Sequence, residues 1–518
     1  MILVLLVGFL VALRQEPWED EIFAVSTAWS LAQSHGHTLS VLADYPHTGS
    51  PVPFYGPVSF YAGAWLIRAF GLSLFAWRSA CFLGIVLCAL VCAQFVKAAG
   101  GDKWPQLATA LFVSLSASVA GTFPGRWDFV TTGLFLGGVL LLVTSLDSRS
   151  SYFFLRVGLA GVPIGLALGS SPRALTLTLA TVVACAFMAV AFKEIRKRVI
   201  LGAVATFAVA VFVHSFLLYP WGLNSISWYR YLRRATKDDY INATPLLGQG
   251  LWVLDLKHHK LLVLSLALLL IVALLGALKR DPNRARTILQ LKLFLTVFAF
   301  ANMFLMLLVL ANALGQTPFW FPPAIAAFMC WADFQSLRAR SRNRVSIVLV
   351  LVALLLLSVE AAEQAVTVAL TWNRRNTVAL TAFVRQTVPS GSTVYGPIGS
   401  YFYPVELSGS QYLYPFEHTT PGLYSKPAPD AGSKMDARIC SYPAYAIWPA
   451  GDRSEHPETQ FIPGMLRERL NQKVAEYDQP PLPKWKTWLL QRMSAVGGKF
   501  GFPSVSIYTL RAIHCGKD

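Results

Sequence analysis

Residues 261–278 read LLVLSLALLLIVALLGAL and are followed directly by Lys279 and Arg280. An uncharged apolar run of this length comes close to the roughly 20 residues that an α-helix needs to cross the hydrocarbon core of a bilayer. Lysine and arginine collect at the cytoplasmic ends of such helices. The stretch therefore predicts a transmembrane helix whose C-terminal end faces the cytoplasm.

Similar apolar runs fill most of the chain before residue 370. They occur at residues 2–13, 78–96, 107–123, 129–146, 153–169, 175–192, 199–219, 291–314, 321–334 and 345–366. Together with 261–278 they predict about eleven transmembrane helices. The first run is short, and no small-residue cleavage site follows it, so we expect a short or N-terminally truncated span and not a signal peptide.

Composition and charge support the same class of protein. The 518 residues are 55% hydrophobic and 14% charged, with a mean hydropathy of +0.50, which excludes a soluble enzyme. The net charge of +17 lies largely in short clusters between apolar runs, where membrane topology explains it, so membrane lipids and not nucleic acid are the expected partners. With a cytoplasmic N-terminus, the clusters at 193–198, 279–286 and 338–344 all fall inside.

The same topology assigns the remaining connections to the outer side of a plasma membrane. These are residues 15–77, 124–128, 170–173, 221–260 and everything after 369. The chain becomes rich in Pro, Gly and Tyr at that point, so we expect a transmembrane domain at 1–369 and a soluble, extracytoplasmic α/β domain at 370–518. In that domain residues 392–396 predict a strand and residues 465–474 predict a helix. Whether Cys440 and Cys515 form a disulfide is left open.

The first outer loop holds the most informative polar residues. Glu19, Asp20 and Glu21 follow the first apolar run and open an amphipathic helical pattern that predicts a helix lying in the membrane interface. Carboxylates at this position can serve chemistry on a lipid-linked substrate. Acidic residues at a helix N-terminus can equally act as caps that favour the helix dipole.

Four motifs in order resemble the GT-C superfamily of membrane glycosyltransferases, and within it the bacterial protein mannosyltransferases and the lipid A aminoarabinose transferase. The motifs are the Asp20-Glu21 pair, the stretch from Tyr61 to Gly84 with Phe75-Ala76-Trp77-Arg78, the segment Gly125-Arg126-Trp127-Asp128-Phe129, and the turn Gly165 to Arg173. The resemblance covers mainly the first ~180 residues, and the remainder agrees only in architecture. Tyr55-Gly56-Pro57 departs from it, because relatives often carry Lys-Pro-Pro there.

The resemblance implies transfer of a sugar from a polyprenyl phosphate or pyrophosphate donor to a glycan, lipid or protein acceptor on the outer face, with inversion. One displacement requires a base for the acceptor hydroxyl, and a carboxylate suits this role. Asp20 matches the first acid of the family pair, Glu21 is second, and Asp128 either holds Arg126 or takes part directly. Whether Asp128 helps to bind a divalent cation stays open, and no other cofactor is indicated.

Cationic residues are needed for the leaving phosphate. The candidates at the outer face are Arg78, Arg126, Arg173, Arg230 and Arg233, each of which has interfacial snorkelling as an alternative explanation. The candidate substrate-binding residues in and after the Pro- and Tyr-rich turn are His47, Tyr55 and Tyr61. The tail also contains aromatic residues that could bind an acceptor glycan, although we favour a place in the core of a small domain. They are Tyr401, Phe402, Tyr403, Tyr412, Tyr414 and Trp448.

Two other classes of protein stay open. A secondary transporter or lipid flippase would place charges near the bilayer midplane and often shows repeated halves, whereas the charges here gather at one face and no repeat is visible. A non-catalytic assembly factor would use the tail to recruit a partner, but about eleven spans exceed what an anchor needs.

Overall fold

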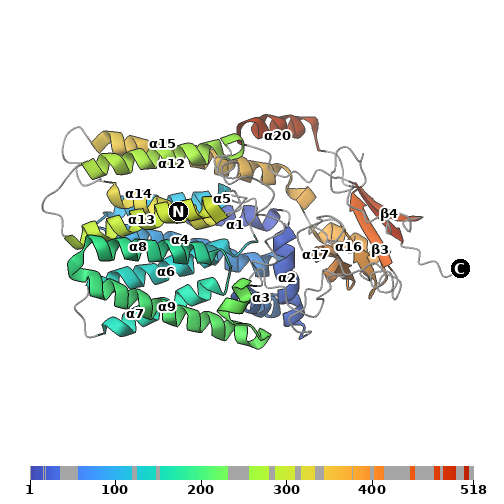
Figure 1. Cartoon of the computed structure of the whole chain (residues 1–518). Helices are drawn as coiled ribbons and strands as arrows, with labels where there is room; N and C mark the ends of the chain where they lie inside the picture. The colour runs from blue at the N-terminus through green and yellow to red at the C-terminus, as the bar shows by residue number, and fades with distance from the viewer. Residues whose placement is uncertain are drawn as a thin grey trace.

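The computed structural model describes residues 2–15, 17, 19–34, 56–119, 125–147, 152–230, 256–278, 286–309, 317–332, 343–375, 377–396, 402–413, 444–449, 472–478, 482–497 and 507–512. A bundle of roughly parallel helices forms most of the molecule (Figure 1). Helix α2 runs across one end of this bundle, and the strands of the C-terminal part lie beyond α2.

The described part of the chain carries a helix at every segment that hydropathy predicts to span a membrane. The bundle contains α1 (Ile2–Arg14), α4 (Leu74–Ala98), α5 (Lys103–Val119), α6 (Asp128–Asp147), α7 (Phe153–Leu168), α8 (Ala174–Ala191), α9 (Arg196–Leu218), α12 (Leu256–Leu278), α13 (Arg286–Val309), α14 (Thr317–Trp331) and α15 (Asn343–Leu370). Among the described residues, 7 helices are long and apolar enough to cross a membrane, namely α4, α6, α8, α9, α12, α13 and α15, and α1 and α7 are shorter apolar helices. The chain is therefore a multi-pass membrane protein.

Glycines allow α7 and α9 to approach closely. A Cβ atom at Gly161 would lie 2.4 Å from the Thr206 carbonyl oxygen, and one at Gly165 would lie 2.7 Å from that of Ala210. The Thr206 hydroxyl donates to the Val157 carbonyl oxygen at 2.8 Å. Small residues one turn apart thus permit backbone contact, which is how helices associate where lipid offers no hydrophobic driving force.

Helix α14 is buried along almost its whole length in the middle of the bundle. It contains Pro322 and Pro323, and a proline in a helix leaves the carbonyl four residues earlier without its usual donor. The side-chain amide of Asn302, on α13, donates to the Phe319 carbonyl oxygen at 3.0 Å. This bond replaces the one that Pro323 cannot make, as the low-dielectric interior requires.

The short helices α2 (Glu19–Ala32) and α3 (Pro57–Phe70) pack together at one end of the bundle. Residues Glu21 to Ala28 of α2 are buried apart from the half-buried Phe23. The sequence predicted a helix with one polar face in the membrane interface. The structure differs because α3 and the C-terminal part of the chain also cover α2, so it is enclosed between layers.

The C-terminal part contains a five-stranded mixed sheet of order β2-β1-β3-β5-β4. The strands are β1 (Thr393–Tyr395), β2 (Gln411–Leu413), β3 (Ala444–Pro449), β4 (Gln472–Asp478) and β5 (Ile507–Ala512). β1 is parallel to β2 and β3, whereas β5 is antiparallel to β3 and β4. Helices α16 (Thr377–Thr387), α17 (Phe402–Leu407) and α20 (Lys484–Gly497) accompany it.

Two sequence predictions for this part have different outcomes. β1 lies within the stretch 392–396 that was predicted to be a strand. The helix predicted at 465–474 falls mostly outside the described residues, and its last three positions belong to β4. Cys440 and Cys515 also lie outside the described residues. The five cysteines of the apolar runs are free and buried, as small core residues.

Candidate active site

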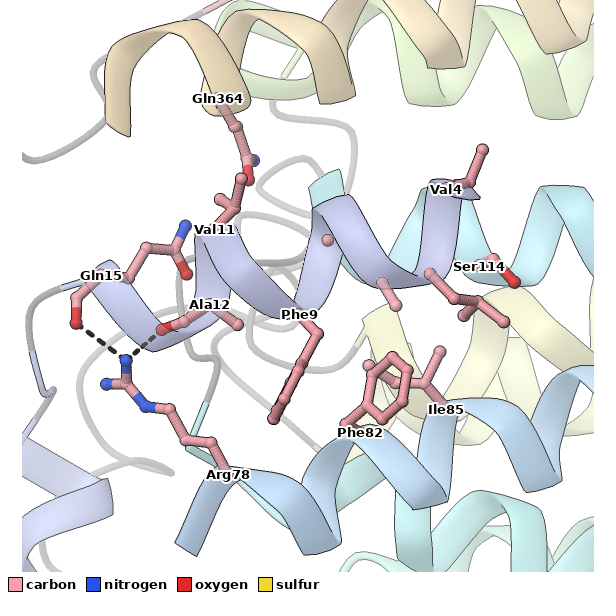
Figure 2. A pocket seen from close by; sticks show the side chains of 13 residues that line it. Val4, Phe9, Val11, Ala12, Gln15, Arg78, Phe82, Ile85, Ser114 and Gln364 are labelled. Atoms are coloured by element: carbon pink, nitrogen blue, oxygen red, sulfur yellow. Dashed lines mark hydrogen bonds between the residues drawn. The ribbon is translucent and has the colours of Figure 1, made fainter. Parts of the chain in front are cut away.

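A buried ion pair connects the first turn of α2 to the N-terminal part of α4. Arg78 Nε donates to Glu21 Oε1 at 2.8 Å, and Arg78 Nη2 donates to Glu21 Oε2 at 2.6 Å. Arg78 Nη1 also donates to the carbonyl oxygens of Ala12 and Gln15, at the C-terminal end of α1 (Figure 2). One guanidinium thus ties α1, α2 and α4 together, and both charged groups are fully engaged.

A second ionic cluster forms where α6 and α8 begin. Asp128 is the first residue of α6 and receives Arg126 Nε at 2.9 Å on Oδ2 and Arg173 Nη1 at 3.7 Å on Oδ1. The carboxylate and Arg126 are almost completely buried, whereas the Arg173 side chain is 26% exposed. Arg173 combines a long contact with solvent access, so its guanidinium is the one best able to reach an incoming anion.

The two ionic clusters are joined through the residues that precede α6. A Cβ atom at Gly125 would lie 1.9 Å from the Glu21 carboxyl carbon, so a glycine is needed for the backbone to approach this carboxylate. Trp77 Nε1 donates to the Gly125 carbonyl oxygen at 2.6 Å, and the rings of Trp77 and Trp127 lie 5.5 Å apart. The motif residues 125–129 therefore sit directly beside Glu21.

The end of the loop that leads into α3 rests on the turn that follows α7. Gly56 N donates to the Ser170 carbonyl oxygen at 3.1 Å, and Val58 N donates to that of Gly169 at 2.9 Å. A Cβ atom at Gly56 would collide with Gly169, 1.9 Å from its carbonyl oxygen. Two motifs that are far apart in sequence are thus neighbours, and they place the loop end close to Arg173.

The remaining candidate residues from the sequence are not part of the two ionic clusters. Tyr61 lies on α3 with 38% of its surface exposed. Arg230 is exposed and follows Trp228 and Tyr229, which pack on His214 of α9. His47, Tyr55, Arg233 and the side chain of Asp20 fall outside what the structure describes, although Asp20 belongs to the first turn of α2.

Sequence reasoning did not find the contact between α2 and the C-terminal part. Trp29 Nε1 donates to Glu406 Oε2 at 3.0 Å, and Tyr412 N donates to Glu406 Oε1 at 2.9 Å. Burial raises the pKa of the Glu406 carboxyl to about 7. The two hydrogen bonds lower this pKa, but their effect is smaller than that of burial. Trp29 and Glu406 are too far apart in sequence for any local pattern to pair them.

Two residues that the sequence analysis named, Tyr403 and Trp127, prove to be buried donors near the ion pairs. Tyr403 of α17 and Trp127 belong to the same hydrophobic cluster as Val25 and Trp77. The Tyr403 hydroxyl and Trp127 Nε1 are buried and have no hydrogen-bond partner among the described residues. Burial and the nearby Glu21 carboxylate hold the pKa of Tyr403 well above its usual value, so its hydroxyl stays protonated as a donor.

A small cavity lies beside Arg78, between α1, α4, α5 and α15 (Figure 2). Its volume is about 50 Å³, and its polar lining consists of Gln15, Arg78, Ser114 and Gln364. This is room for a few water molecules and not for a sugar or a lipid phosphate. Within the described residues, no three His, Cys, Asp or Glu side chains gather in a way that could hold a metal ion.

Comparison with solved structures identifies the architecture. ArnT from Cupriavidus metallidurans bound to undecaprenyl phosphate superposes with a TM-score of 0.58 at 12% identity, covering 99% of this chain and 96% of ArnT. The apo state of the same protein gives a TM-score of 0.60. The oligosaccharyltransferase of Archaeoglobus fulgidus in its apo form gives 0.53 at 13% identity, covering 99% of this chain and 88% of that enzyme. The chain has the GT-C glycosyltransferase fold.

The GT-C resemblance of the four motifs is thus confirmed at the level of the fold. No protein-family model and no curated protein sequence matches the chain. The shared architecture extends over nearly the whole length of the chain. Because the sequence identity is so low, the choice of individual site residues depends on the geometry described above.

Proposed function

We propose that this protein is an integral-membrane glycosyltransferase that moves a sugar from a polyprenyl-phosphate donor to an acceptor on the outer face of the plasma membrane. The gathering of Asp128, Arg126 and Arg173 beside the Glu21–Arg78 pair, at one end of a GT-C bundle, carries the proposal. About eleven spans over residues 1–369 hold this site, and residues 370–518 form the outer domain that covers it.

Asp20 is assigned as the base. It removes the proton from the acceptor hydroxyl, the acceptor oxygen bonds to the anomeric carbon, and the bond from that carbon to the phosphate oxygen breaks with its electron pair leaving on the phosphate. A single displacement of this kind inverts the anomeric centre. Glu21 is a weaker choice, because both of its oxygens already accept bonds from Arg78.

Arg173 is assigned to the leaving phosphate. Negative charge grows on that group as the sugar departs, and a cation fixed nearby stabilises the charge. Asp128 and Arg126 position the Arg173 guanidinium, since the carboxylate lies between both arginines. Arg230 and Arg233 are further candidates for the donor head group, and His47, Tyr55 and Tyr61 for the sugar or acceptor.

The test compares folded variants in sugar transfer from labelled polyprenyl-phosphate donors to a membrane extract. Asp20→Asn is expected to abolish transfer, and Arg173→Gln to lower the rate by about 10²- to 10³-fold, as loss of one charge-stabilising group does. Arg156→Gln serves as the matched control and is expected to have wild-type activity. Arg156 is exposed in the first turn of α7, at the opposite end of that helix from the turn that leads to Arg173. Full activity of Asp20→Asn would remove Asp20 from the mechanism and leave Glu21 or Asp128 as the base.

A further inference from the structure

Helix α20 is an unusual surface element of the C-terminal part, because it lies alongside the outer ends of α12 and α15 and not against the sheet (Figure 1). Lys486 Nζ donates to the Leu370 carbonyl oxygen, the last residue of α15, at 3.2 Å. Helix α15 has 28 residues and is therefore about 40 Å long, against a hydrocarbon core of about 30 Å. A helix of this length extends beyond the hydrocarbon core, and α20 lies against the end of α15 that carries Leu370.

The side chains of α20 divide into three faces. Lys486, the buried Leu490 and the half-buried Met493 are four and seven residues apart and form the packed face. Thr487 and Gln491 are exposed on a polar face.

The third face of α20 carries two tryptophans beside cations. Trp485 and Trp488 are each 58% exposed. Arg492 lies one turn after Trp488 with its guanidinium carbon 5.7 Å from that ring, and Lys486 Nζ lies 5.6 Å from the Trp485 ring. No acidic residue occurs from 484 to 497, and Lys484 is also exposed. Exposed tryptophans next to cations are typical of segments in the membrane–water interface.

Exposed apolar side chains and a cation also lie near the end of α15 that α20 contacts. Val366 and Trp372, near the end of α15, are 40% and 38% exposed, and the Arg14 guanidinium lies 4.4 Å from the Trp372 ring. Aromatic rings beside cations thus occur both on α20 and just after the end of α15, which Lys486 contacts. We propose that α20 binds the outer leaflet through Trp485 and Trp488, with Lys484 and Arg492 contacting anionic phospholipid head groups, and so fixes the C-terminal part to the membrane.

The experiment uses the full-length protein in nanodiscs of phosphatidylcholine with a minority of phosphatidylglycerol. A photo-crosslinking phenylalanine derivative replaces Trp488, Trp485 or, as the matched control, Thr487, and mass spectrometry measures lipid adducts after irradiation. Phe212, 70% exposed on α9, gives the positive control. All four positions are exposed, so the variants should fold, and monodisperse elution checks this.

The proposal predicts severalfold more lipid adduct at positions 488 and 485 than at 487, with phosphatidylglycerol enriched over its share in the nanodisc. That enrichment should fall when Lys484→Gln and Arg492→Gln are combined with the photo-reactive residue at 488, and also at high salt. Equal, low yields at 488 and 487 while position 212 reacts would overturn the proposal. Adducts in simple proportion to lipid composition would overturn the role of the two cations.

Discussion

The pair formed by Glu21 and Arg78 is extensively hydrogen-bonded. Each carboxylate oxygen accepts one guanidinium N–H, and the third guanidinium nitrogen serves the end of α1. Both side chains have no exposed surface. When one partner of a buried ion pair is removed, the remaining charge stays buried and its desolvation is no longer compensated. When both partners are removed together, no such charge is left. These residues therefore matter first for assembly of the site.

At the scale of single residues we expect a non-additive effect at this pair. Glu21→Gln and Arg78→Met should each destabilise the protein by about 3–5 kcal/mol, because each leaves the other charge buried. The double variant Glu21→Gln/Arg78→Met should recover a large part of the loss. Thermal unfolding in detergent, followed by the fraction of monodisperse protein, measures all four corners of the cycle. Strictly additive losses would contradict a direct coupling between the two side chains.

Among the elements, helix α7 shows how spacing in the sequence sets a contact in the bundle. Gly161 and Gly165 both face backbone carbonyls of α9, whereas a Cβ atom at Gly158 would meet nothing within 4 Å. The three glycines lie on one helix and differ in whether a neighbour is present. They consequently provide a controlled comparison of helix packing against the intrinsic effect of replacing glycine.

Replacing Gly165 by Ala should lower stability by about 1–3 kcal/mol, because the added methyl group meets the Ala210 carbonyl oxygen and Val213 of α9. Gly158→Ala should be neutral or slightly stabilising, since alanine favours a helix. The thermal unfolding midpoints of the two variants and the wild type decide the comparison. Equal midpoints for both variants would show that α7 and α9 can separate without cost.

Element positions could be predicted from the sequence, but contacts between residues far apart in the chain could not. The apolar run 261–278 shows where α12 lies because burial in lipid demands about 20 uncharged residues in a row. Asp128 could be named because a carboxylate just inside a membrane span is costly, and Arg173 because it ends a turn that resembles the GT-C motif; the structure brings the two together. Trp29 and Glu406 lie on different elements and depend on tertiary packing, so no periodicity pairs them. For the same reason the cover over α2 was missed.

For the whole molecule, the contact between α2 and α17 joins the bundle to the C-terminal part. The pKa of Glu406 is raised by burial to about 7, so the folded protein binds this proton more tightly than the unfolded chain does. Stability from Glu406 is therefore present at acidic pH and is lost as the pH rises through about 7. The bond from Trp29 remains in both protonation states, which limits the size of the change.

We expect the unfolding free energy of the wild type to fall on the order of 1 kcal/mol between pH 5.5 and 8 relative to Glu406→Gln. The amide cannot titrate but keeps an oxygen for Trp29, so this variant isolates the proton. Thermal midpoints of both proteins across the pH range give the difference. A difference that grows in the opposite direction, or parallel curves, would contradict a carboxyl that is protonated in the docked state.

The central claim is that the bond between sugar and carrier phosphate is broken by this chain. The direct measurement follows a polyprenyl-phosphate sugar labelled in both parts, added with membrane extract to wild-type protein and to Arg173→Gln in nanodiscs. We predict that wild type frees one carrier phosphate for every sugar that reaches the acceptor, and that Arg173→Gln slows both together. Intact donor that crosses the bilayer, with no carrier released, would contradict a glycosyltransferase and indicate a lipid flippase.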